Sequence, residues 1–138
     1  MGYMSQMKAV YIGNLQIECM HKDSGAKIVT NAPKEVGGLG QSFSPTDLVA
    51  LALGTCMLTV LAMAANKLGI DLKGTTLEVE KEMGSTPRKI VKIVVRIRCP
   101  HAVNKQIQEK LEKAALECPV YYSLHPDVRK EIDFIWGI

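Results

Sequence analysis

Two cysteines occupy settings in which a thiol can do chemistry. Cys56 lies in the middle of a long uncharged run, and Cys118 immediately precedes Pro119. Because the residue before a proline is pushed out of the α region, we expect Cys118 at a helix joint, where unpaired N–H groups and the helix dipole favour a thiolate. A thiol buried in a helix and a thiol at a helix joint are suited to act as the attacking and the resolving cysteine of a redox pair. The alternative for Cys56 is a small core residue, and periodicity alone does not say whether the two thiols meet.

Metal and nucleotide chemistry are weaker interpretations. Cys19 and His21 are two residues apart, as are Cys99 and His101, so four zinc ligands could in principle converge. Structural zinc sites usually hold ligand pairs on tight knuckles, whereas these pairs fall at predicted strand ends. We therefore interpret them as core cysteines beside surface histidines. The sequence has no P-loop, GxGxxG, GxSxG or HExxH pattern, and we expect neither a metal nor a cofactor.

The helix that must carry Cys56 has a distinct start. Ser44 can cap it, Pro45 fits its first position, and Asp47 can close a capping box. Residues 48–65 hold no charge and reach the minimum length of a membrane span. At about 27 Å the run is short, and amphipathic strands follow it, so we interpret it as a buried helix that stops at Gly69. In so small a chain a second subunit must cover its other side, which predicts an obligate dimer.

Hydrophobic periodicity predicts the other elements. A hairpin of alternating apolar and charged residues has one solvent-exposed face, where acidic and basic residues of neighbouring strands can pair. A second helix is amphipathic and ends before Cys118. The predicted elements are strands over 8–12, 15–20 and 27–30 with a turn at Gly13-Asn14, a loop over 31–43, hairpin strands over 77–83 and 91–97, a helix over 104–117, a helical turn over 119–124 and a last strand over 131–138.

The composition is that of an ordinary soluble domain. The chain has 138 residues, 47% hydrophobic and 22% charged, which is enough for one core, and we predict a single domain over 1–138. Its net charge of +3 is mild and its basic residues alternate with Glu, so we expect no nucleic-acid partner and no membrane. No secretory pattern occurs at the N-terminus. We therefore expect a cytoplasmic protein with reduced cysteines, where a pair that does oxidise is more often catalytic than structural.

Two stretches resemble a known superfamily. Residues 37–56, GGLGQSFSPTDLVALALGTC, and 116–124, LECPVYYSL, are similar to the two cysteine motifs of osmotically inducible protein C and the organic hydroperoxide resistance proteins, the OsmC/Ohr superfamily. The order of the predicted elements is similar along nearly the whole chain. The resemblance implies an α+β fold and an intertwined homodimer, with two central helices packed between outer antiparallel sheets.

The same resemblance implies a cysteine-based hydroperoxide reductase. Cys56 would be the peroxidatic thiolate that becomes a sulfenic acid, Cys118 would resolve it as a disulfide, and a dithiol reductant, such as one of the lipoyl type, would restore both thiols. The family holds its thiolate with an acidic residue, matched here by Asp47, and with an arginine from the N-terminal strands. No arginine precedes Arg88 in this sequence. The candidate substitutes are Lys8, Lys22 and Lys27, or Arg88, Arg96, Arg98 and Arg129 from the other subunit.

The missing arginine favours an alternative function, whereas the intact pair of Cys56 and Cys118 favours the enzyme. Asp47 precedes Cys56 by nine residues, which on a straight helix is about 900° of rotation and about 13.5 Å of rise. Asp47 should then cap the helix without touching the thiol, unless the helix kinks at Gly54. A thiol buried among apolar groups without a cation has a raised pKa. The alternative is a non-catalytic protein that binds a small hydrophobic ligand in an apolar crevice of the dimer.

Overall fold

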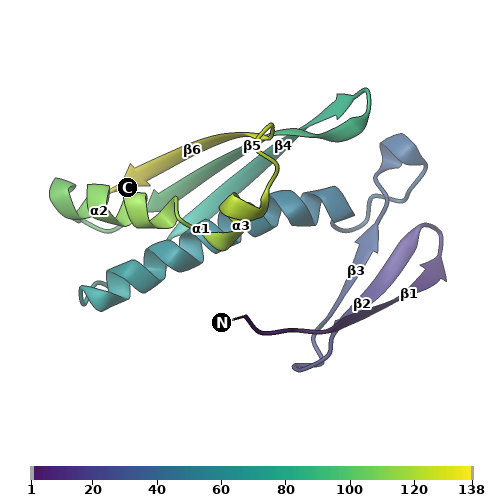
Figure 1. Ribbon diagram of the computed structural model, residues 1–138, viewed down its shortest axis with the longest axis horizontal. Helices are drawn as coiled ribbons and strands as arrows, with labels where there is room; N and C mark the ends of the chain where they lie inside the picture. Colours follow the sequence, from purple (N-terminus) through teal and green to yellow (C-terminus); the bar gives the residue numbers. More distant parts are fainter. Residues whose placement is uncertain (1, 138) are drawn as a thin grey trace. The chain divides into compact units, whose positions relative to one another are not determined.

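The computed structural model describes residues 2–137 and has an α+β fold with two three-stranded sheets (Figure 1). The chain divides into two compact units, an N-terminal unit that ends at Leu48 and a C-terminal unit that begins at Val49. In chain order the elements are β1 (Met7–Gly13), β2 (Gln16–His21), β3 (Lys27–Asn31), the 3-10 helix η1 (Lys34–Val36), α1 (Pro45–Lys67), β4 (Thr76–Ser85), β5 (Arg88–Cys99), α2 (Lys105–Ala115), α3 (Pro119–Ser123) and β6 (Arg129–Trp136).

The N-terminal unit is an antiparallel sheet in the order β1-β2-β3. The three strands agree with the predicted ranges, but the first turn lies one residue later than expected. Asn14 and Leu15 form it, with φ of 55° and 58°. Two successive positive φ values match the twist of a tight hairpin, and asparagine adopts that conformation readily. The sheet leaves many large apolar side chains exposed, namely Met7, Val10, Tyr11, Ile12, Leu15 and Ile28.

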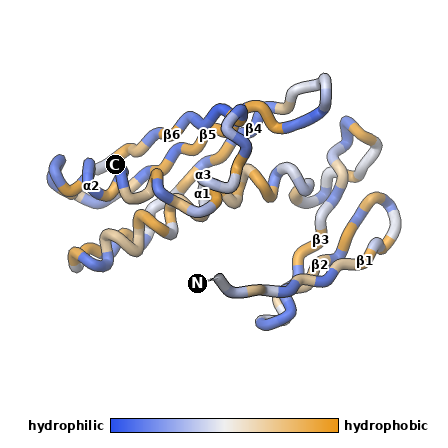
Figure 2. Tube along the Cα trace, in the orientation of Figure 1, coloured by the Kyte–Doolittle hydropathy of each residue, from blue (hydrophilic) through white to orange (hydrophobic). Residues whose placement is uncertain are grey.

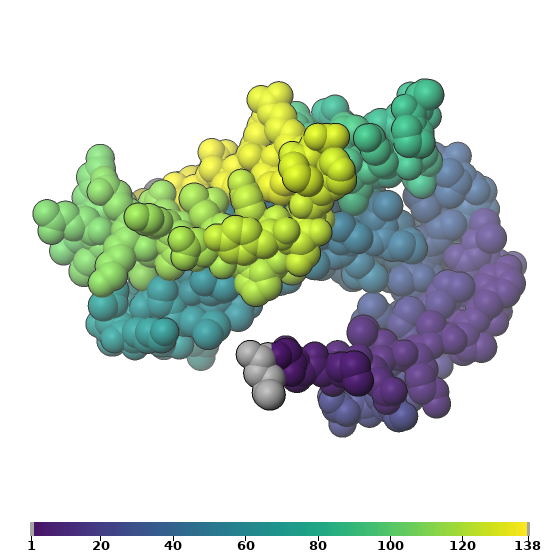
Figure 3. Space-filling model, viewed as in Figure 1, coloured from purple at the N-terminus to yellow at the C-terminus, as the bar shows by residue number. Residues whose placement is uncertain are grey.

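The sheet of the C-terminal unit has the order β4-β5-β6 and is mixed. β4 and β5 form the predicted antiparallel hairpin, but β6 runs parallel to β5. The expectation of wholly antiparallel sheets is therefore wrong for this unit. A parallel neighbour needs a crossover connection, which α2 and α3 supply between β5 and β6. Figure 3 shows α2, α3 and β6 forming a continuous surface.

The β4–β5 hairpin has one solvent-exposed face and one buried face, as predicted. Ile93, Val95 and Ile97 are fully buried, while the charged side chains of Lys92, Arg96 and Arg98 reach solvent. Opposite charges pair across the strands, as in Arg96–Glu80 at 2.6 Å and Arg98–Glu78 at 3.6 Å. The charged face is thus explained as a solvated sheet surface, where each pair contributes at most about 1 kcal/mol.

Helix α1 starts and stops as the sequence predicts. The Ser44 N–H donates to the Asp47 carboxylate at 2.9 Å and the Asp47 N–H donates to the Ser44 hydroxyl at 3.0 Å, which completes the capping box. Gly69, at φ 73°, ends the helical segment. α1, α2 and α3 lie on one side of the β4-β5-β6 sheet (Figure 1). The helix is unbroken through Gly54, where an added Cβ would lie 2.7 Å from a methyl of Val79, so this glycine permits close packing and does not introduce a kink.

One side of α1 is buried and the other is not. Leu53, Met57 and Leu61 are fully buried against the sheet, whereas Val49 and Met63 are 40% and 56% exposed. Figure 2 shows apolar residues along much of the helix. By length and composition α1 could span a membrane, with 33% of its most apolar window buried in the molecule. The expectation of a helix covered on every side is therefore not met within one chain.

Candidate thiol site

Cys56 lies at the centre of α1, where it is half-buried. It packs against the hydrophobic core of the C-terminal unit, to which Met57 and Leu53 belong. Its neighbours Thr55 and Thr59 are exposed, so Cys56 stands at the border between the buried and open sides of the helix. A thiol at such a border is held rigidly by the helix and is accessible to a small molecule.

Cys118 is the N-cap residue of α3. Its Sγ accepts the Tyr121 N–H at 3.3 Å, and Pro119 occupies the first helical position. Proline there costs no hydrogen bond because the first N–H groups of a helix have no partner inside it. The side chain of Cys118 is fully buried. The predicted hinge position is confirmed.

The two thiols lie close enough to affect one another, because both pack in the same core and Cys56 contributes to the pKa of Cys118. Burial raises the pKa of the Cys118 thiol, and Cys56 raises it further, while the N–H groups of Tyr121 and Val120 lower it. The expectation that the helix start makes Cys118 a thiolate is wrong, because burial outweighs the two N–H groups. The raised pKa keeps Cys118 a protonated thiol at neutral pH.

Asp47 lies in the first turn of α1, where its carboxylate completes the capping box. Because α1 continues without interruption from Asp47 to Cys56, the rotation between them is that of a regular helix, about half a turn out of phase. Asp47 thus has a structural role in starting the helix that carries the thiol.

Cationic side chains do not contribute to the pKa of Cys118 among the described residues. The influences on that thiol are burial, backbone N–H groups and Cys56. Three of the four arginines proposed as substitutes pair with carboxylates of this chain, since Arg96 and Arg98 pair with carboxylates on β4 and Arg129 lies 3.1 Å from Glu131. In the N-terminal unit, Lys22 donates to Gln6 and Lys27 lies near Glu18.

The other cysteines and histidines have separate surroundings. Cys99 is fully buried at the end of β5, and burial raises the pKa of its thiol. His101 bonds to the Lys73 carbonyl at 2.7 Å, and His21 bonds to the Ser24 hydroxyl, also at 2.7 Å. Within residues 2–137 no three His, Cys, Asp or Glu side chains are arranged to hold a metal ion. The two C-x-H pairs therefore form no zinc cluster in the described chain.

Sequence reasoning missed the residues that hold Cys118 in place. Tyr121 supplies the N–H that caps onto the sulfur, and its ring stacks edge-on with Tyr122 at 6.5 Å. The Lys130 ammonium lies 5.1 Å from the Tyr121 ring centre, which ties α3 to β6. The two tyrosines that follow the Cys-Pro pair in the sequence are the signal that could have indicated these contacts.

Fold and site together define an α+β protein with two thiols near one core, one on a central helix and one at a helix start. The chain belongs to the OsmC-like protein family, whose model matches residues 38–133. This confirms the OsmC/Ohr superfamily expected from the two cysteine motifs. No curated protein matches the chain significantly.

Solved structures resemble the chain over nearly its whole length. A protein of Psychrobacter arcticus, named as a candidate osmotic stress induced and detoxification response protein, is 36% identical, with a TM-score of 0.92 over 97% of this chain and 98% of that one. An organic hydroperoxide resistance protein OsmC of Legionella pneumophila is 21% identical, with a TM-score of 0.74 over 99% and 98%. OhrB of Bacillus subtilis, an organic hydroperoxide resistance protein, is 17% identical, with a TM-score of 0.68 over 96% and 98%. The last two show a common fold.

Proposed function

We propose that this protein reduces organic hydroperoxides through Cys56 and Cys118. The observation that carries the proposal is the closeness of the two thiols at one core, one half-buried and one fully buried and protonated. Family membership and the two hydroperoxide resistance proteins of the same fold support a peroxide-related redox function. Asp47 supports the site indirectly by fixing the start of the helix that carries Cys56.

The proposed reaction proceeds in three steps. The Cys56 thiolate attacks the outer oxygen of the hydroperoxide, the O–O bond breaks, and the alkoxide takes a proton to leave as an alcohol. Cys56 is then a sulfenic acid, oxidised by two electrons. Sulfur of Cys118 attacks it, a disulfide forms, and water is released. A dithiol reductant, such as one of the lipoyl type, exchanges with the disulfide and restores both thiols.

Dimer formation is part of the proposal. The open side of α1 presents Val49 and Met63 to solvent, and the N-terminal sheet exposes a set of large apolar residues. Monomeric proteins seldom leave such surfaces uncovered. We infer an intertwined homodimer in which a second copy covers α1, acting as a soluble cytoplasmic protein. Sedimentation that shows a stable folded monomer at micromolar concentration would contradict this assembly.

Thiol titration tests the reaction. One equivalent of cumene hydroperoxide should remove two thiols per chain from a Cys19→Ser, Cys99→Ser background, and the Cys56-Cys118 disulfide should appear in peptide mass spectra. Adding Cys118→Ser should stop the reaction at a sulfenic acid that dimedone traps on Cys56. If neither cysteine is consumed, the reductase assignment is wrong.

A binding protein without catalysis is the second candidate. It is favoured by the absence of an arginine before Arg88 and by the pairing of Arg96 and Arg98 with carboxylates of β4. A thiol without a nearby cation forms less thiolate, so it attacks a peroxide slowly. Retention of all thiols after hydroperoxide treatment, with saturable uptake of a hydrophobic dye, would identify this function.

A further inference from the structure

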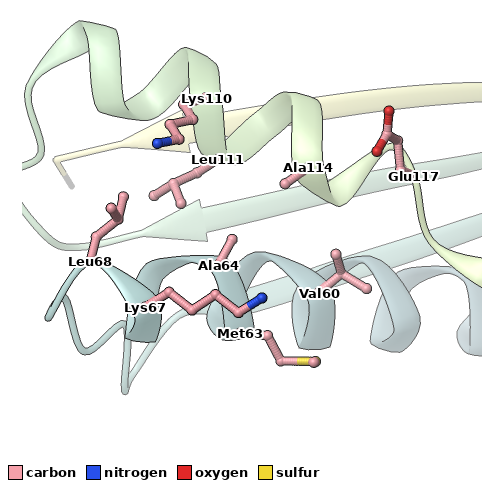
Figure 4. A pocket seen from close by; sticks show the side chains of 9 residues that line it. All are labelled: Val60, Met63, Ala64, Lys67, Leu68, Lys110, Leu111, Ala114 and Glu117. Atoms are coloured by element: carbon pink, nitrogen blue, oxygen red, sulfur yellow. The ribbon is translucent and has the colours of Figure 1, made fainter.

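Within one chain, Cys118 is held in place from the α3 side. The two residues before it, Leu116 and Glu117, are exposed and give it no buried anchor. Figure 4 shows Glu117 on the segment that leaves α2, beside a groove between α1 and α2. On the other side of Cys118, the Tyr121 N–H donates to its Sγ at 3.3 Å. The contacts that hold Tyr121 therefore also hold the sulfur.

Lys130 is a cation on the helix-covered face of the β4-β5-β6 sheet. Alternate residues of a strand share a face, so Lys130 lies on the same face as Ile132 and Phe134, which pack against the hydrophobic core. Asp133 lies on the opposite face, 4.0 Å from Arg96. Lys130 is half-buried, and an ammonium on an apolar face needs polar or aromatic partners to offset its lost hydration.

The Lys130 ammonium has these partners in α3 and in the turn that follows it. It lies 5.1 Å from the centre of the Tyr121 ring. It also donates to the carbonyl oxygens of Val128 at 2.9 Å and His125 at 3.4 Å, in the connection between α3 and β6. One side chain thus joins the aromatic ring of α3, the connection after α3 and strand β6.

We propose that Lys130 is a positioning residue for disulfide formation between Cys56 and Cys118, and that it acts through Tyr121. The inference rests on the proposed reductase function and adds a residue to its second step. Lys130 holds the ring of Tyr121, and the N–H of the same tyrosine holds the sulfur that must reach Cys56. Lys130 does not act on the sulfur by its charge, because the influences on the pKa of Cys118 are burial, backbone N–H groups and Cys56.

Single-turnover oxidation of the full-length protein separates peroxide attack from disulfide formation. In a Cys19→Ser, Cys99→Ser parent given one equivalent of cumene hydroperoxide, Lys130→Met should consume peroxide as fast as the parent. It should form the disulfide about two- to fivefold more slowly, the factor that corresponds to a partly exposed cation–π contact. Lys130→Arg keeps a cation that stacks on aromatic rings and should restore the rate. Lys113→Met, at an exposed position of α2, is the matched control and should change neither step.

The ring of Tyr121 is tested in the same assay. Tyr121→Leu should slow disulfide formation as much as Lys130→Met does, and the double variant should be no slower than either, because both changes remove one contact. Tyr121→Phe keeps the ring and should match the parent. Additive losses in the double variant would overturn the proposal. If Lys130→Met does not fold, the comparison of Tyr121→Leu with Tyr121→Phe decides, and equal rates of disulfide formation would refute the role of the ring.

Hydrogen exchange at the Tyr121 amide measures the positioning without any peroxide. Lys130→Met should raise the exchange rate of this amide about two- to fivefold, and Lys113→Met should leave it unchanged. Unchanged exchange in Lys130→Met would refute the positioning role even if the protein reduces peroxides. Faster exchange in Lys130→Met, together with no peroxide consumption by the parent, would mean that the reductase function is wrong, and with it the role given to Lys130 in disulfide formation.

Discussion

Substitution of Cys118 by alanine and by serine separates its structural role from its redox role. Both variants lose the disulfide, but only serine keeps an acceptor for the Tyr121 N–H, which now reaches sulfur at 3.3 Å. Loss of a side-chain cap costs about 0.5–2 kcal/mol, and typically about 1 kcal/mol. Cys118→Ser should therefore be more stable than Cys118→Ala by about 1 kcal/mol.

Urea unfolding under reducing conditions measures the difference. For a chain of this size, about 1 kcal/mol corresponds to a shift of about 3–5 °C in Tm, which a thermal melt can verify. The control pair is Cys56→Ser and Cys56→Ala. Here the alanine variant should be the more stable of the two, because alanine has the higher helix propensity. Equal stability of the two Cys118 variants, or a less stable serine variant, would refute the view that this sulfur caps α3.

Three other predictions concern packing, pH and reactivity. Gly54→Ala should destabilise the protein by about 1–2 kcal/mol in urea unfolding, because overpacking against the Val79 methyl at 2.7 Å exceeds the gain in helix propensity, and Val79→Ala should show favourable coupling with it. Burial raises the pKa values of Cys99 and Cys118 in the folded state, so the folded chain keeps these protons to a higher pH than the unfolded chain. The free energy of unfolding should therefore be constant below the unfolded thiol pKa of about 8.5 and should fall as the pH rises above it. The fall should be less steep in Cys99→Ala, which has one buried thiol fewer. Iodoacetamide at neutral pH should label half-buried Cys56 well before buried Cys118, as peptide mass spectrometry can measure, and faster labelling of Cys118 would contradict its burial.

Local features were predictable from sequence because their causes are local. The Ser44–Asp47 capping box needs only residues three positions apart, and Asn104 caps α2 by accepting the Ile107 N–H at 2.9 Å. The sulfur-capped turn after Cys118 followed from its proline in the same way. In each case the residue types fix the backbone geometry within one helical turn.

Features that depend on distant residues were not predictable in this way. The parallel pairing of β6 with β5 depends on the path of the α2–α3 crossover, which no periodicity encodes. The pKa direction of Cys118 was predicted wrongly from its helix start, because the burial that raises it comes from the tertiary core. The closeness of Cys118 to Cys56 likewise arises from packing between elements 62 residues apart in sequence. The catalytic roles of the pair stay predictions.

The raised pKa of Cys118 makes a last prediction about the proposed cycle. In the reduced protein, burial raises this pKa most, and Cys56 raises it further once it carries the thiolate charge of the proposed cycle. Oxidation of Cys56 to a neutral sulfenic acid removes the charge and leaves burial, so the pKa of Cys118 should fall once its partner is oxidised. Peroxide attack would thereby activate the resolving thiol only when it is needed.

Burial still keeps that pKa above its usual value, so disulfide formation should accelerate with pH as Cys118 ionises. In a Cys19→Ser, Cys99→Ser background treated with one equivalent of cumene hydroperoxide, dimedone should trap more Cys56 sulfenic acid at pH 6 than at pH 9, and disulfide should replace it as pH rises. Cys118→Ser, which cannot resolve, is the control and should give equal trapping across this range. If the lifetime of the sulfenic acid does not depend on pH in the protein with Cys118 intact, ionisation of the buried thiol does not limit disulfide formation. The proposed link between the pKa of Cys118 and the rate of resolution would then be wrong.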